Sequence, residues 1–173
     1  MTNTLDIIAL EAANTSRVSF STIAELASAI CEGHLDTWSH RMLEEAGIRL
    51  KVIGRQHLRE DGGYIVMSNH QSRYDIPVLY QALGIPMQMV ESKEIPGIPL
   101  RAVASGKQIL PVTIDGTQAL SASGGSQASP KRTATVTIGE PIDPTPYGRE
   151  KIDRLIAVVK DAIESNLSAS SCL

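Results

Sequence analysis

The stretch that most constrains the fold of this chain is residues 64–83, where an apolar run leads into a helical pattern. Residues 64–67 are apolar at every position, which is typical of a strand that is buried on both faces of a sheet. Residues 74–83 then show apolar side chains at helical spacing and end before Gly84, a common residue at a helix C-terminus. A strand buried on both faces needs helices on either side, so this stretch predicts an α/β fold.

The remaining chain repeats this alternation. Strand patterns cover residues 48–53, 64–68, 87–90, 109–114 and 133–138, and helical patterns cover residues 74–83, 100–105 and 148–167. Such an alternation predicts a single open, mostly parallel sheet with flanking helices. Pro111 falls inside one strand and indicates an edge position or a bulge, because proline has no N–H for the ladder. Residues 117–132 are rich in Ser, Gly and Ala and predict a mobile loop.

The N-terminal part of the chain is predicted to be helical. We divide the chain into an N-terminal helical segment (residues 1–34), one α/β domain (residues 35–167) and a tail (residues 168–173). Gly33 is expected to separate one amphipathic helix from a second helix that ends at Gly47. These helices either dock on the domain or lie on a lipid surface. Their acidic polar faces favour docking, because an anionic membrane attracts Lys and Arg.

The composition excludes several classes of function. Of the 173 residues, 42% are hydrophobic and 20% are charged, as in ordinary soluble domains. A net charge of −3 with only 3% aromatic residues argues against nucleic acid as a partner. Cys31 and Cys172 have no metal-ligand spacing and fit a reducing, cytoplasmic setting. No apolar run approaches the roughly 18 residues that span a bilayer, so we expect any membrane contact to be peripheral.

The polar residues between the strand and the helix include a candidate general base. His70 and Asp75 lie five positions apart across the junction. A carboxylate on one ring nitrogen of a histidine fixes the tautomer that leaves the other nitrogen free to accept a proton. Ser68 and Ser72 are nearby but lie outside any G-x-S-x-G motif, so the pair is expected to activate an external hydroxyl or water. Backbone N–H groups at the start of the 74–83 helix are candidate donors to an oxyanion.

Several segments of the sequence resemble the signature blocks of one enzyme family. Residues 68–79 (SNHQSRYDIPVL) are similar to the first block of the glycerolipid acyltransferases, the 1-acylglycerol-3-phosphate acyltransferase group, whose mark is His, four residues, Asp. Residues 47–54 resemble the strand that precedes this block in the family. Residues 93–99 resemble the second block, residues 109–117 the fourth block, and residues 136–142 the C-terminal end of the family. The resemblance covers about residues 35–167, in the order of the family.

The resemblance implies an acyl transfer in phospholipid synthesis. His70 would deprotonate the hydroxyl of lysophosphatidate or a related glycerophospholipid, and that oxygen would attack the thioester of acyl-CoA or of an acyl-carrier protein. Asp75 would orient His70, while Asn69, Arg73 and Lys93 would contact substrate. The mechanism implies no cofactor, no metal and no covalent acyl-enzyme. The reaction would take place at the cytoplasmic face of the membrane, with the enzyme bound peripherally.

The sequence departs from the family at its third signature block. A Phe-Pro-Glu-Gly-Thr-Arg-like segment, with the arginine that would hold the acceptor phosphate, is absent between the second and fourth blocks, and Ser92-Lys93 stands where the family often has two lysines. The resemblance therefore implies a shortened fold of the glycerol-3-phosphate acyltransferase type. Three functions stay open: a working acyltransferase, a shortened relative that binds lipid or a partner without turnover, and a thioesterase-like hydrolase.

Overall fold

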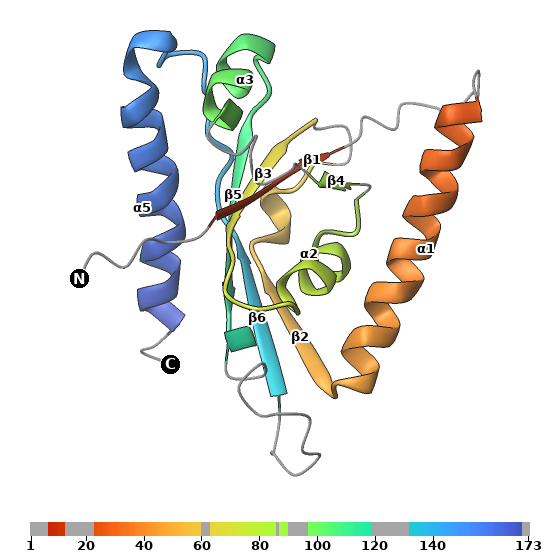
Figure 1. The fold of residues 1–173 in the computed structure, drawn as a ribbon. Coiled ribbons are helices and arrows are strands. Elements are labelled where there is room, and N and C mark those ends of the chain that lie inside the picture. Colours follow the sequence, from red (N-terminus) through yellow and green to blue (C-terminus); the bar gives the residue numbers. More distant parts are fainter. Residues whose placement is uncertain are drawn as a thin grey trace.

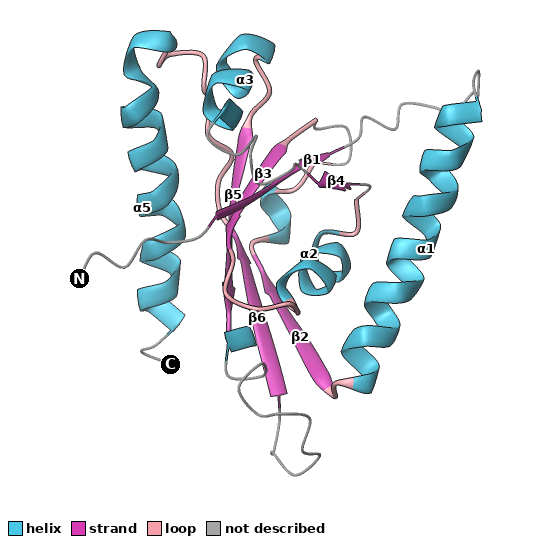
Figure 2. Ribbon diagram, viewed as in Figure 1, coloured by secondary structure: helices cyan, strands magenta, loops and turns pink. Residues whose placement is uncertain are grey.

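One six-stranded sheet separates two layers of helices in the computed structural model, which describes residues 7–12, 23–59, 63–85, 87–89, 97–118 and 132–170. The strands are β1 (Ile7–Ala12), β2 (Ile48–Ile53), β3 (Ile65–Asn69), β4 (Met87–Met89), β5 (Ile109–Asp115) and β6 (Arg132–Ile138). The longer helices are α1 (Ile23–Glu45), α2 (Asp75–Leu83), α3 (Ile98–Ser105) and α5 (Ile152–Ser170). Helices α1 and α2 lie on one side of the sheet, and α3 and α5 lie on the other (Figure 1). The same layers are seen by secondary-structure type in Figure 2.

The sheet has the order β2-β6-β5-β3-β1-β4 and is mixed. The pairs β2–β6 and β3–β5 are parallel, whereas β5–β6, β1–β3 and β1–β4 are antiparallel. The prediction of an α/β chain with a single open sheet and flanking helices is confirmed. The prediction of a mostly parallel sheet is wrong, because the burial pattern of a strand does not specify the direction of its neighbours.

The N-terminal segment is the largest departure from the predicted fold. Residues 7–12, which fall in the predicted helical segment, form β1, an antiparallel strand inserted between β3 and β4. Gly33 does not divide two helices, since α1 continues through it from Ile23 to Glu45. A glycine inside a helix costs only about 1 kcal/mol, and α1 gains packing against α2. No helix in the described part of the chain is long and apolar enough to cross a membrane.

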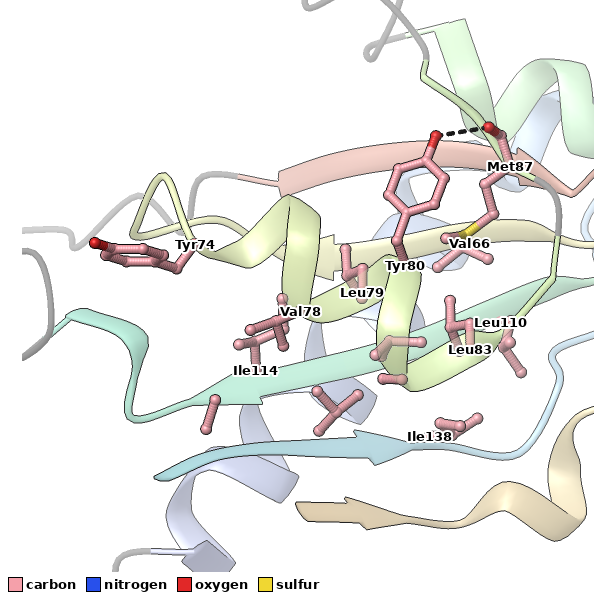
Figure 3. Close-up of a cluster of buried hydrophobic side chains, with 14 of the residues drawn as sticks. Val66, Tyr74, Val78, Leu79, Tyr80, Leu83, Met87, Leu110, Ile114 and Ile138 are labelled. Atoms are coloured by element: carbon pink, nitrogen blue, oxygen red, sulfur yellow. Dashed lines mark hydrogen bonds between the residues drawn. The ribbon is translucent and has the colours of Figure 1, made fainter. Parts of the chain in front are cut away.

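The central strands β3 and β5 are buried on both faces, as predicted for residues 64–67. Val66, Leu110 and Ile114 pack with α2 on one face (Figure 3). Ile65 and Ile109 belong to a second cluster, with side chains of α3 and α5, on the other face. Because alternate side chains of each strand enter different cores, the end of β3 is held between two packed layers.

Pro111 lies in a central strand, so the predicted edge position is wrong, but the pairing shifts by one residue there, between Val112–Ile138 and Ile109–Ile142, in line with the predicted irregularity. It is one step beyond Val112–Ile138, the last pair of the β5–β6 ladder. The Gly139 N–H donates to the Pro111 carbonyl at 2.8 Å, but proline has no N–H to donate in return. The strand tolerates Pro111 because its missing donor falls just outside the ladder. At the other end of the chain, α5 extends to Ser170, so residues 168–170 belong to the helix and not to a tail.

Candidate active site

A tight turn between β3 and α2 brings His70 and Asp75 together. β3 ends at Asn69 and α2 begins at Asp75. Within the turn, the Asp75 N–H donates to the Ser72 carbonyl at 3.0 Å, and the Tyr74 N–H donates to the Ser72 hydroxyl at 3.2 Å. These bonds fold residues 70–74 back on themselves. As a result, the side chain at the start of the helix points toward the residue that follows the strand.

The Asp75 carboxylate is completely buried and is surrounded by donors. Its Oδ2 accepts hydrogen bonds from the N–H groups of Gln71 at 2.6 Å and Ser72 at 2.7 Å. The same oxygen lies 3.1 Å from the Nδ1 atom of His70. Its Oδ1 accepts a hydrogen bond of 2.5 Å from the Thr117 hydroxyl. This set of donors suits an ionised carboxylate, which accepts hydrogen bonds and donates none.

His70 is held on one side and accessible on the other. Its side chain is 38% exposed, whereas that of Asp75 is 1% exposed. Because an ionised carboxylate only accepts hydrogen bonds, Nδ1 of the neutral imidazole carries the proton and Nε2 keeps a lone pair. The two residues predicted to form a base and its orienting carboxylate therefore lie within hydrogen-bonding distance of each other.

Thr117 is a member of the site that the sequence analysis did not identify. It lies two residues after the end of β5, is 1% exposed, and reaches Asp75 across 42 positions of the chain. Gly116 makes this possible, because its φ of 86° is unfavourable for other residues and a Cβ there would collide with the Thr133 carbonyl. The sequence shows only that Thr117 lies just past a strand; its contact with Asp75 requires that this strand be the parallel neighbour of β3 and end at the same edge of the sheet.

The structure gives Asn69 a different place from the substrate contact expected of it. Its side chain is 1% exposed. Its Nδ2 donates to the Ile114 carbonyl at 2.8 Å, and its Oδ1 accepts from the Ile114 N–H at 2.8 Å. The carboxamide thus continues the β3–β5 ladder one step beyond the backbone pairing, which ends at Ser68–Val112. This corrects the expectation: the Asn69 side chain joins two strands and faces away from solvent.

The two basic residues predicted to contact substrate have different outcomes. Arg73 is exposed and lies over the ring of Tyr74, with its guanidinium carbon 5.0 Å from the ring centroid. Its Nη2 donates to the Tyr74 hydroxyl at 3.1 Å, so the Arg73 side chain is held against the next residue of the turn that carries His70. Lys93 lies outside the described residues. Contact of either residue with substrate remains a prediction.

The first two N–H groups of the 74–83 segment, which were expected to be oxyanion donors, are already hydrogen-bonded within the turn. The N–H groups of Gln71, Ser72, Tyr74 and Asp75 all donate to acceptors within the turn. The expectation is therefore wrong at Tyr74 and Asp75, whose N–H groups donate to Ser72, and the N–H groups of Gln71 and Ser72 are used on the Asp75 carboxylate. Ser68 is fully buried and its hydroxyl donates to the Asn69 carbonyl at 3.2 Å.

The other histidines that the structure describes lie away from this site. His40 pairs with Glu44 on the exposed face of α1, with 3.4 Å between Nε2 and Oε1. His57 is half-buried, and its Nδ1 lies 2.9 Å from the Ile138 carbonyl of β6. Within the ranges that the structure describes, no group of three or more His, Cys, Asp or Glu side chains has the arrangement of a metal site.

Comparison with known proteins relates both the sequence and the fold to acyltransferases. A family model described as Acyltransferase matches residues 49–113, the range that includes His70 and Asp75. A search of curated proteins found no significant match. The fold resembles the crystal structure of the 1-acyl-sn-glycerophosphate (LPA) acyltransferase PlsC from Thermotoga maritima, with a TM-score of 0.53 and 18% sequence identity over 84% of this chain and 83% of that chain. At this identity the structural match shows a shared fold.

Proposed function

We propose that this chain, which an Acyltransferase family model matches over residues 49–113, transfers a fatty acyl group to the hydroxyl of lysophosphatidate or a related glycerophospholipid. The donor is acyl-CoA or an acyl-carrier protein, and His70 is the general base. The observation that carries this proposal is the hydrogen bond between His70 Nδ1 and the buried Asp75 carboxylate, at 3.1 Å. It leaves Nε2 of a partly exposed imidazole as the proton acceptor.

The proposed reaction is a direct transfer. Nε2 of His70 takes the proton of the acceptor hydroxyl as that oxygen attacks the thioester carbonyl carbon. The carbon–sulfur bond then breaks, and the thiolate leaves with the proton from the imidazolium. Asp75 stabilises the imidazolium in between. General-base assistance of this kind contributes roughly 10²- to 10⁴-fold to a rate.

The surroundings of His70 support an external hydroxyl as the nucleophile. Ser68 is fully buried and Ser72 is 6% exposed, and the Ser72 hydroxyl accepts a hydrogen bond from the Tyr74 N–H. Neither hydroxyl lies open to a donor thioester, as a serine that forms an acyl-enzyme must. This favours attack by the acceptor lipid itself.

Substrate contacts and location are part of the proposal. Arg73 is held beside the turn that carries His70, and we assign it and Lys93 to the phosphate of the acceptor, because both side chains are cationic. A lysophospholipid is presented at a membrane surface, so the chain acts peripherally on the cytoplasmic face of a bilayer. No metal or cofactor takes part in the proposed step.

The test is acceptor-dependent release of thiol from acyl-CoA. Purified protein receives acyl-CoA with and without lysophosphatidate, and free thiol is followed together with the acylated lipid. His70→Ala is expected to abolish the acceptor-dependent release, whereas the control His40→Ala, which removes an exposed imidazole on α1, retains it. Acceptor-independent release that needs His70 would instead indicate a hydrolase. No release from folded protein would identify a relative without turnover, and either result would overturn the proposal.

A further inference from the structure

We infer that Thr117 is a positioning residue that locks the Asp75 carboxylate and thereby orients His70 for proton transfer. This inference rests on the proposed function. Thr117 follows the C-terminal end of β5, whereas the two residues proposed for the proton transfer, His70 and Asp75, lie on the turn between β3 and α2.

The two oxygens of Asp75 are held by different parts of the chain. The donors to Oδ2 are His70, Gln71 and Ser72, all within five residues of Asp75. The donor to Oδ1 is Thr117, from the segment that follows β5. The rotation of a carboxylate about its last side-chain bond is soft, so donors on one oxygen leave its plane free to turn. A donor on the second oxygen fixes that plane, and with it the direction of the bond to His70 Nδ1.

The position of Thr117 is itself fixed by the sheet. Asn69, the residue before His70, binds the Ile114 backbone through both polar atoms of its side chain. Gly116 then turns the chain at a positive φ and places the Thr117 hydroxyl against Asp75. The end of β5 is therefore tied to the end of β3 on both sides of His70: through Asn69 before it and through Asp75 after it.

The chain offers a matched pair of threonines for the test. Thr113 and Thr117 are each 1% exposed. The Thr113 hydroxyl donates to the Ile163 carbonyl of α5 at 2.9 Å, on the opposite face of the sheet from α2. Replacing either threonine with valine removes one buried hydroxyl and nearly preserves side-chain shape. Only the change at Thr117 removes a donor to Asp75.

The kinetic experiment compares Thr117→Val, Thr117→Ser and Thr113→Val in the acyl-transfer assay. Loss of one hydrogen bond to a charged group predicts a fall in kcat of about 10- to 100-fold for Thr117→Val, with KM for the acceptor changed by less than about 2-fold. Thr117→Ser restores the donor and is expected to recover most of kcat, while Thr113→Val leaves kcat near that of the unmodified protein. An unchanged kcat in Thr117→Val, or an equal fall in Thr113→Val, overturns the inference.

A second measurement does not depend on activity. In protein with ¹⁵N-labelled histidine, the Nδ1–H signal of His70, assigned with His70→Ala, is expected to be protected from exchange and to remain so in Thr117→Ser and Thr113→Val. It is expected to be lost to exchange in Thr117→Val, or in Thr117→Ala if the valine variant does not fold. If no form of the protein transfers acyl groups, the proposed function fails, but this signal still decides whether Thr117 positions the pair. An equally protected signal without the hydroxyl overturns the inference.

Discussion

Replacing Asn69 with alanine tests whether its side chain joins two strands, as in the structure, or contacts substrate, as the sequence resemblance implies. A side chain that only touches substrate can be removed without loss of stability. A side chain that pairs two strands cannot, because Asn69→Ala deprives the buried Ile114 N–H and carbonyl of their partners at 2.8 Å. We therefore expect the variant to lose stability as well as activity.

The size of the loss follows from the two backbone groups left without partners. Each buried polar group that loses its partner costs about 1–3 kcal/mol, so Ile114 alone predicts a fall of roughly 2–6 kcal/mol in the free energy of unfolding. A water molecule in the space vacated by the carboxamide would satisfy part of this requirement. We therefore expect a value of about 2–4 kcal/mol, which is large beside the 5–15 kcal/mol typical of a whole domain.

Urea unfolding followed by circular dichroism measures this difference. The matched control is Asn166→Ala on α5, where the amide donates to the Ala162 carbonyl of the same helix at 3.1 Å. Such a substitution is expected to change stability by less than about 0.5 kcal/mol. An Asn69→Ala protein as stable as the unmodified chain, with a raised KM for the acceptor, would refute the reasoning. It would return Asn69 to the substrate contacts.

Three further predictions concern charge and backbone. Asp75→Asn is expected to fold but to lower kcat by roughly 10³- to 10⁴-fold in the thiol-release assay, because an amide no longer selects the required histidine tautomer. Gly116→Ala is expected to lower the unfolding midpoint in urea, since a Cβ would meet the Thr133 carbonyl at a positive φ; an unchanged midpoint would contradict this. The Thr145 hydroxyl and then its N–H lower the pKa of Asp143, so Thr145→Ala is expected to raise that pKa in an NMR titration, and a further fall would refute the assignment.

The parts of the site that follow from local sequence were predicted, and the parts that depend on strand order were not. His70 and Asp75 lie on one turn, so their meeting required only a strand followed by a helix. The contact of Thr117 with Asp75 depends on β5 lying beside β3, and no pattern within either segment specifies that neighbour. Burial of β3 on both faces followed from its unbroken apolar run.

The errors in the fold have the same origin. The insertion of β1 between β3 and β4 and the antiparallel direction of β6 against β5 are choices among strand pairings of similar local pattern. Propensity also failed at Gly33, where the contacts of α1 outweigh a helix-breaking residue. The edge position predicted for Pro111 was wrong because the rule against proline in central strands concerns its N–H, and here that position falls at the one-residue offset in the pairing beyond the β5–β6 ladder.

The donors to Asp75 come from residues 70–72 and from Thr117, so none of these contacts involves the connection between β4 and β5, where the resemblance would place the absent phosphate-binding block. The geometry of His70 therefore does not depend on the absent block. We expect the absence of that block to affect binding of the acceptor instead. We expect the KM for lysophosphatidate to lie within about 10-fold of the KM for a monoacylglycerol, because an arginine–phosphate pair, worth roughly 1.5–3 kcal/mol, is missing and the phosphate is left to Arg73 and Lys93. Steady-state acylation of both acceptors measures this. A KM for lysophosphatidate more than about 10-fold lower, with the whole difference removed by Arg73→Ala, would show that Arg73 fully replaces the absent arginine, and the argument that shortening weakens phosphate recognition would fail.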